Sequence, residues 1–489
     1  MSILGLIFFL LAGGMLAWVS QRISEELPRW MALASLFASV FFLFYLADEP
    51  NSAGIFSEYN APWIDRFGIS FSFVMDGLSL ALVALTIFLG FISVYAAWRQ
   101  IKERTGFFYF NLLWTLAGVV GVFTAFDLFL FFFFWEVMLI PMYFLIAIWG
   151  HENKSYAALK FFLFTQISGL FLLAAIVALA YFNYSSSGEL TFNYFRLLEA
   201  NLPGNIEYLL MLGFFIAFVV KLPAAPFHTW LPDAHTQAPT AGSVILAGIL
   251  LKTGAYGLLR FVIPLFPEAS MDFRWFAMAL GAFSVVYGGY LAYSQSDFKR
   301  LVAYSSISHM GFVLLGIFAW NQMAIQGSIV QMVAHGFSSA ALFMMAGELQ
   351  DRLHTRDMAK MGGIWMRAPR MGATALFFVA ASLGMPGLGT FVGEFLILMG
   401  VFKVDIFLTI VAALGIIIAA VYSLVLMQKT FQGSSAVGRP EDISFPDFGI
   451  REMQAMLVMA IALIILGVYP QPLLDLTLPF VDGLEGVGR

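Results

Sequence analysis

Cysteine is absent from the 489-residue sequence, and charged residues are scarce. The lack of cysteine excludes disulfides, Fe–S ligation and haem attachment through a CxxCH motif in this chain. Asp, Glu, Lys and Arg make up 11% of the residues, against about 25% in a soluble globular domain. The net charge of −5 comes without a basic stripe that could neutralise phosphates, so we expect no nucleic-acid partner.

Hydrophobic residues make up 61% of the chain, including 54 Phe and 24 Met. They form long apolar runs, and such runs predict membrane-spanning helices of about 20 residues and not the alternating strands of a barrel. The first run, residues 3–19, lacks a basic segment and a cleavage pattern, so we expect a retained helix and not a signal peptide. The runs predict fourteen spans, which begin near residues 2, 30, 74, 108, 127, 155, 207, 241, 272, 301, 324, 371, 404 and 452.

The distribution of Lys and Arg supports this count. Lys221 and Lys252 fall inside predicted spans, and of the other 23 basic residues 17 fall in alternate loops while six fall on the opposite side. The side rich in Lys and Arg is expected to be cytoplasmic. The pattern therefore predicts an integral membrane protein with both termini on the side opposite the cytoplasm.

The predicted fold class is an all-α polytopic membrane protein of about fourteen transmembrane helices. A separation of 173 positions joins Glu136 to His309 and also Lys221 to Glu394. The matching offset predicts two five-helix repeats, helices 4–8 and 9–13, with the second inverted relative to the membrane. The sequence contains no long linker or low-complexity tract, so we expect no large soluble domain. The predicted parts are the first three helices in residues 1–107, the first repeat in 108–262, the second repeat in 263–431, and helix 14 with the tail in 432–489.

Six ionisable side chains interrupt the predicted spans. An ionised group at mid-bilayer costs at least about 2.5 kcal/mol, so it faces the bundle interior and usually has a function. A lysine removed from water loses affinity for its proton and a nearby carboxylate restores it, so a change in their separation would load or unload the lysine. We interpret the six residues as a proton relay: Glu136, Lys221, Lys252, His309, His335 and Glu394.

Two alternatives stay open for these residues. The charged groups could be static ion pairs that fix helix contacts. A lone buried histidine is more often a hydrogen-bonded core residue than a ligand, and two histidines on neighbouring spans could bind a b-type haem. We favour proton transfer because imidazole exchanges protons near neutral pH.

Two predicted spans are broken beside charged residues. Pro223 and Pro226 follow the lysine of the seventh span, and Pro386 and Gly387 precede the glutamate of the twelfth span. Proline removes a backbone donor and clashes with the preceding turn, so both helices are expected to break. Breaks at matching positions of two halves indicate a transport site.

Other polar residues near the breaks and the span starts have simpler interpretations. His228, Asp233 and His235 lie in the proline-rich segment and either line an entry route or cap helix ends. We expect no metal site. Three aspartates near span starts are expected to complement helix dipoles: Asp76, Asp127 and Asp297.

A long signature resembles a known family. The run Lys221-Leu-Pro-Ala-Ala-Pro-Phe-His-Thr-Trp-Leu-Pro-Asp-Ala-His, continuing to Lys252, is similar to the central signature of antiporter-like subunits of respiratory complex I, NADH–quinone oxidoreductase. The likeness covers the whole chain and includes Trp135-Glu136, Tyr304-Ser-Ser-Ile-Ser-His309-Met-Gly and Ala334-His335-Gly. Within that family, Phe391-Val-Gly-Glu394-Phe is similar to the M-type subunits, since the L- and N-type chains and the antiporter relatives generally carry Lys there.

This resemblance implies a proton-translocating membrane subunit that itself carries out no redox chemistry. It implies that Glu136 pairs with Lys221, that Lys252 is the central group, and that Glu394 is the exit, with the two histidines between. It implies no cofactor in this chain, with FMN, Fe–S clusters and quinone in partner subunits. The implied partners are the lipid bilayer and the other membrane subunits of complex I, with two antiporter-like chains as neighbours.

The alternatives to this function are a subunit of a multi-subunit Na⁺/H⁺ antiporter or of a membrane-bound hydrogenase. A third interpretation is a scaffold or haem-binding subunit of another membrane complex.

Overall fold

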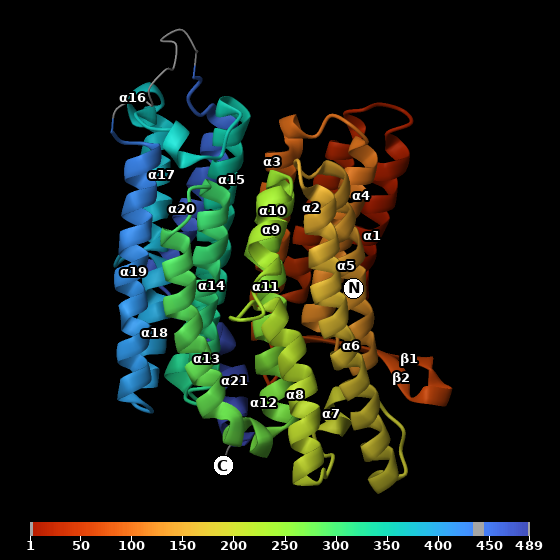
Figure 1. Cartoon of the computed structure of the whole chain (residues 1–489). Coiled ribbons are helices and arrows are strands. Elements are labelled where there is room, and N and C mark those ends of the chain that lie inside the picture. Colours follow the sequence, from red (N-terminus) through yellow and green to blue (C-terminus); the bar gives the residue numbers. More distant parts are fainter. Residues whose placement is uncertain (1–2, 434–444, 488–489) are drawn as a thin grey trace. The chain divides into compact units, whose positions relative to one another are not determined.

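Helices dominate the chain, as the sequence predicts. The structure is a computed structural model and describes residues 3–433 and 445–487 (Figure 1). Within these residues, thirteen helices are long and apolar enough to cross a membrane. They correspond to predicted spans 1–11, 13 and 14. The predicted twelfth span is divided between two shorter helices, α17 (Pro369–Ser382) and α18 (Gly389–Phe402).

Contacts between residues divide the chain into two compact units. Unit 1 comprises Met1–Pro223, Ile249–Phe276 and Asp475–Arg489, and unit 2 comprises Ala224–Gly248 and Ala277–Leu474. The five-helix repeats and their boundaries stay a prediction, because this division follows contacts and not internal symmetry.

Unit 1 holds the N-terminal helices. Its described elements are α1 (Ile3–Ser20), α2 (Leu27–Leu46), β1 (Ile55–Ile64), the 3₁₀ helix η1 (Asp65–Phe67), β2 (Ile69–Asp76), α3 (Gly77–Gln100), α4 (Thr105–Thr124), α5 (Leu128–Trp149), α6 (Lys154–Ser187), α7 (Tyr194–Leu197), α8 (Gly204–Lys221), α11 (Leu251–Gly257), the π-helical η3 (Leu258–Val262) and α12 (Ile263–Leu265).

Unit 2 holds most of the later helices. Its described elements are α9 (Trp230–Gln237), α10 (Thr240–Ile245), α14 (Phe298–Ile317), α15 (Gln322–Leu353), η4 (Met358–Lys360), α16 (Ile364–Arg367), α17, α18, α19 (Ile406–Thr430) and α20 (Ile450–Val468). Three elements contribute residues to both units: the π-helical η2 (Leu246–Leu250), α13 (Pro267–Tyr293) and α21 (Gln471–Val487).

Glycines allow the helices of unit 1 to approach closely. A Cβ atom on Gly118 of α4 would lie 2.5 Å from the backbone nitrogen of Met138 on α5. In lipid there is no hydrophobic driving force between helices, so they associate through the close van der Waals packing that small residues allow. In the same unit α6 contacts α5 and α8, and α8 contacts α11. This packing brings together the helices that carry Glu136, Lys221 and Lys252.

Helix α15 is the centre of unit 2, where it contacts α10, α14, α17, α18 and α20. A Cβ atom on Gly393 of α18 would lie 2.7 Å from the backbone nitrogen of Gln331 on α15. Glycine at this position therefore places Glu394, the next residue along α18, beside the middle of α15.

The structure locates both helix breaks. Helix α8 ends at Lys221 and α9 begins at Trp230, so Pro223 and Pro226 lie in the non-helical segment between them. Helices α17 and α18 are separated by residues 383–388, which contain Pro386 and Gly387. The φ angle of Gly387 is +90°, a conformation that side chains with a Cβ rarely adopt.

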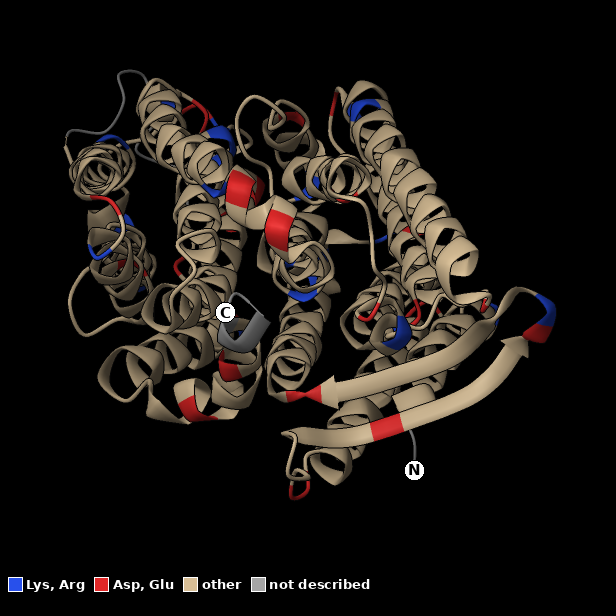
Figure 2. Ribbon diagram, turned by 90° about the horizontal axis from the view of Figure 1, so that it is seen from below, with Lys and Arg blue, Asp and Glu red and all other residues tan. Residues whose placement is uncertain are grey.

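The sequence-based prediction lacks a β-hairpin and a C-terminal helix. An antiparallel hairpin joins β1 to β2, with Tyr59 opposite Phe73, and Figure 2 shows the two strands as a curved pair. Helix α21 lies where only a short tail was expected. Both elements are short and mix polar with apolar residues, so neither produces a long apolar run.

The three aspartates near span starts are helix caps, which confirms their interpretation. Asp76, Asp127 and Asp297 accept backbone N–H groups at the starts of α3, α5 and α14. Asp127 accepts from Phe129 and Leu130 at 3.0 Å each, and its second oxygen accepts from the backbone nitrogen of Ser70 at 2.9 Å. Burial raises the pKa of Asp127, although these hydrogen bonds oppose the shift. Asp127 therefore fixes the start of α5, the helix that carries Glu136.

We expect Asp127→Ala to destabilise the protein by about 1–2 kcal/mol, because the variant removes an N-cap and leaves the Ser70 amide without its acceptor. Asp127→Asn should lose less, since the amide oxygen still accepts the capping bonds and burial disfavours the charge. Thermal unfolding in detergent measures both variants. Equal stability of Asp127→Ala and the parent would contradict the capping role.

Candidate functional site

Glu136 and Lys221 lie in unit 1 but form no direct ion pair. Glu136 is half-buried on α5, and the side-chain nitrogen of Gln166 on α6 donates to its Oε1 at 3.4 Å. Lys221 ends α8 and is fully buried. Among the described residues, no hydrogen-bond partner reaches its Nζ, and no ion pair within 4.0 Å joins it to Glu136. The two groups still interact electrostatically.

Aromatic rings surround the Lys221 ammonium instead. Its Nζ lies 5.3 Å from the ring centroid of Trp135 and 5.4 Å from that of Phe161. Both distances fall within the range of about 6 Å at which a ring face attracts a cation. The structure therefore shows the Nζ of Lys221 near two ring faces and outside hydrogen-bonding distance of the carboxylate.

Lys252 lies in a helix of irregular winding. The side chain is fully buried on α11, and π-helical segments flank α11 on both sides, residues 246–250 and 258–262. Such π segments are common at functional sites. A Cβ atom on Gly254 would lie 2.7 Å from the backbone nitrogen of Leu222. The helix of Lys252 thus crosses the end of α8 directly beside Lys221.

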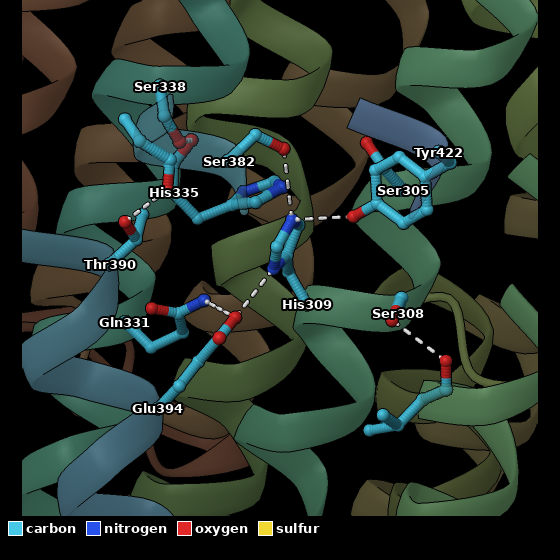
Figure 3. Close-up of polar contacts among 12 residues, drawn as sticks. Ser305, Ser308, His309, Gln331, His335, Ser338, Ser382, Thr390, Glu394 and Tyr422 are labelled. Atoms are coloured by element: carbon cyan, nitrogen blue, oxygen red, sulfur yellow. Dashed lines mark hydrogen bonds and ion pairs between the residues drawn. The ribbon is translucent and has the colours of Figure 1, made fainter. Parts of the chain in front are cut away.

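The second group of buried residues lies in unit 2 around Glu394 (Figure 3). Glu394 is 2% exposed, and its Oε1 lies 2.7 Å from Nδ1 of His309 on α14. The side-chain amide of Gln331 on α15 donates to the same oxygen at 2.9 Å. Glu394 and His309 are therefore in direct contact, and a neutral amide fixes the carboxylate from a third helix.

His309 has polar partners on both ring nitrogens. Its Nε2 lies 3.4 Å from Oγ of Ser382 and 3.3 Å from the hydroxyl of Tyr422. The ring centroid of His335 is 5.5 Å away. An imidazole with a partner on each side can take a proton at one nitrogen and release one at the other, so this geometry suits proton exchange with Glu394.

The sequence analysis did not identify four polar side chains that contact the predicted site residues: Gln166, Gln331, Ser382 and Tyr422. Gln331 could have been found, because it is a polar residue in an apolar run four positions before His335 and so shares its helix face. Nothing in the sequence distinguishes Tyr422 from other tyrosines of the spans.

The three residues proposed for an entry route have different surroundings within unit 2. Asp233 accepts from Nη1 of Arg300 at 3.0 Å. His228 lies edge-on to Tyr287, with ring centroids 5.5 Å apart, and His235 stacks on Phe343 at 4.4 Å. No metal-binding group of three or more His, Asp or Glu side chains occurs in residues 3–433 and 445–487.

The sequence is similar to known proteins over nearly its full length. A family model described as NADH:quinone oxidoreductase/Mrp antiporter, transmembrane region, matches residues 125–419. The chain is 52% identical over 488 residues to NADH-quinone oxidoreductase subunit M of Pseudomonas aeruginosa, with 97% of this chain and 95% of that protein covered. Identity to subunit M of Escherichia coli is 50% over 476 residues, with 95% and 93% covered.

Solved structures show the same fold. A chain of respiratory complex I from Thermus thermophilus superposes with a TM-score of 0.90 at 30% identity, with 100% of both chains covered. A chain of the Mrp complex from Dietzia superposes with a TM-score of 0.83 at 19% identity and 99% coverage of both, which concerns the fold alone. The family match and the identities of 50% and more show that the chain belongs to the family of NADH:quinone oxidoreductase/Mrp antiporter transmembrane proteins.

Proposed function

We propose that the chain is a proton-translocating membrane subunit of an NADH-quinone oxidoreductase and moves protons from the cytoplasm to the periplasm. The observation that carries this function is the buried contact between Glu394 and His309, with further ionisable groups buried in both units. Similarity over nearly the whole length to proteins named subunit M supports the choice of complex.

The proposed relay begins with Glu136 and Lys221. A change in the distance between them alters the proton affinity of the lysine, because a nearby carboxylate stabilises the ammonium form while burial destabilises it. The proton then passes to Lys252, and from there through His309 and His335 to Glu394. Release occurs on the periplasmic side, and the cytoplasmic side is the one rich in basic loops. His228, Asp233 and His235 are candidates for the entry route.

The buried contacts around Glu394 give His309 and Gln331 different roles in the proposed relay. His309 offers one nitrogen to the carboxylate and the other to the hydroxyls of Ser382 and Tyr422. A proton taken up at one ring nitrogen can therefore be matched by release from the other. Gln331 donates to the Glu394 carboxylate and holds it in place during transfer.

The same proposal assigns redox chemistry to other chains. Partner subunits would hold FMN, Fe–S clusters and quinone, and quinone reduction there would change the Glu136–Lys221 separation. Two antiporter-like chains would be neighbours in a bacterial inner membrane, with both termini of this chain in the periplasm. Exporting one proton against 100 mV requires about 2.3 kcal/mol, which the rearrangement of one buried ion pair can supply.

Glu136→Gln and Lys221→Ala should each reduce proton pumping by roughly tenfold or more, because each variant removes one of the two groups whose separation sets the proton affinity of the lysine. Pumping is measured by dye quenching in inner-membrane vesicles energised with NADH, with complex content checked by native gels. Glu189→Gln, on an exposed loop residue, is the matched control and should pump normally. Full pumping by both Glu136→Gln and Lys221→Ala would refute the proposed relay, and sodium-dependent pH changes without NADH would favour antiport.

Gln331→Leu should lower pumping several-fold and less than Glu394→Gln does, because the variant removes a hydrogen bond to a charged group worth about 1.5–3 kcal/mol but keeps the carboxylate. The same vesicle assay tests the pair. Gln454→Leu on α20, where the side chain is exposed, controls for loss of a glutamine from a membrane helix. Normal pumping by Glu394→Gln would exclude this carboxylate from the relay.

A further inference from the structure

Lys221 is buried beside aromatic side chains and interacts with Glu136 only through space, without a hydrogen bond between them. The side chain is fully buried, and within the described part of the chain no hydrogen-bond acceptor contacts Nζ. Its nearest described partners are the faces of Trp135 on α5 and Phe161 on α6. A buried ammonium without hydrogen-bond partners is strongly disfavoured, so these ring faces contribute to stabilising its charged form alongside the charge of Glu136.

Trp135 and Glu136 offer Lys221 two different partners on consecutive residues. Successive residues of an α-helix point about 100° apart, so the indole and the carboxylate leave α5 in different directions. The ends of both side chains nevertheless lie near Gly169 of α6. A Cβ atom on Gly169 would lie 3.3 Å from Oε1 of Glu136 and 3.7 Å from Nε1 of Trp135. In the structure the carboxylate bonds to Gln166 while the indole faces the ammonium.

Further aromatic side chains hold the Trp135 ring in place. Its centroid lies 5.7 Å from that of Phe131 and 5.6 Å from that of Phe218, and the side chain is fully buried. The attraction between a cation and a ring face is strongest away from water and with tryptophan. The ring is therefore a buried surface, packed between its neighbours, beside which the ammonium can lie.

We propose that Trp135 and Phe161 form an aromatic docking position that holds the protonated Lys221 side chain after it separates from Glu136 and before it passes its proton on. The inference rests on the proposed relay and adds positioning residues to it. The Glu136–Lys221 pair can then open without leaving a bare charge in the membrane interior, because the ammonium moves from a carboxylate to two ring faces. Lys221 keeps its proton during this step, and no bond to hydrogen is broken.

Substitutions at Trp135 in the assembled complex test the docking position. Trp135→Leu keeps an apolar side chain and removes the ring face, and it should lower proton pumping in NADH-energised vesicles roughly tenfold, which corresponds to about 1.4 kcal/mol. Trp135→Phe should keep more activity than Trp135→Leu, since phenylalanine attracts cations less strongly than tryptophan but more than leucine does. Phe161→Leu should also reduce pumping.

The matched control is Phe108→Leu. Phe108 on α4 is equally buried and packs on Tyr109 and Trp149, but it is not among the described rings against Lys221 or Trp135. A loss in Phe108→Leu as large as in Trp135→Leu would assign the effect to packing and overturn the inference.

A graded series separates charge attraction from shape even if Trp135→Leu fails to assemble. Fluorotryptophans incorporated at position 135 weaken the electron-rich ring face with each fluorine and change the side-chain volume little. The logarithm of the pumping rate should fall steadily along the series. A flat series, together with loss of pumping in Lys221→Ala, would reject the docking position while leaving the relay intact. Full pumping in Lys221→Ala would instead reject the relay itself.

Discussion

The cost of a charged side chain away from water determines how this molecule is built. Several buried ionisable groups of the described residues have specific partners. Glu394 has His309 and Gln331, Lys221 has two ring faces, and Arg260 pairs with Asp76. A charge that can be moved between two such partners stores and releases free energy. The glycine crossings and the broken helices serve this constraint, because they bring the partners within contact distance in an apolar surrounding.

The two units meet the constraint in different ways. In unit 2 the carboxylate and imidazole are already in hydrogen-bonding contact, with serine and tyrosine hydroxyls continuing from the ring. In unit 1, Glu136 and Lys221 form no hydrogen bond, and the Nζ of Lys221 lies near the rings of Trp135 and Phe161. The first arrangement suits proton exchange, and the second suits an ion pair that opens and closes. A relay needs both properties, one to pass protons and one to respond to a partner.

The sequence contains most of the information about the helices and part of the information about the site. Apolar runs as long as residues 128–149 and prolines such as Pro223 mark helices and their ends through chemistry local to the chain. The hairpin of β1 and β2 was missed because its strands are short and half-buried. Gln331, Ser382 and Tyr422 were missed because neutral polar side chains are common in spans, and only three-dimensional packing places them beside His309. The Glu136–Lys221 pairing that the resemblance implies stays a prediction. The positions of Trp135 and Phe161 near Lys221 were missed, because they join different helices and no local pattern encodes them.

The central claim is that these buried groups exchange protons, which requires water wherever side chains do not touch. An experimental map of the assembled complex, at a resolution that shows ordered water, tests it most directly. The account predicts water molecules in contact with Lys252 and extending from it towards the next ionisable group, and water or hydroxyl contacts leading away from Glu394. Dry apolar packing around Lys252 or Glu394 in every state of the complex would contradict it.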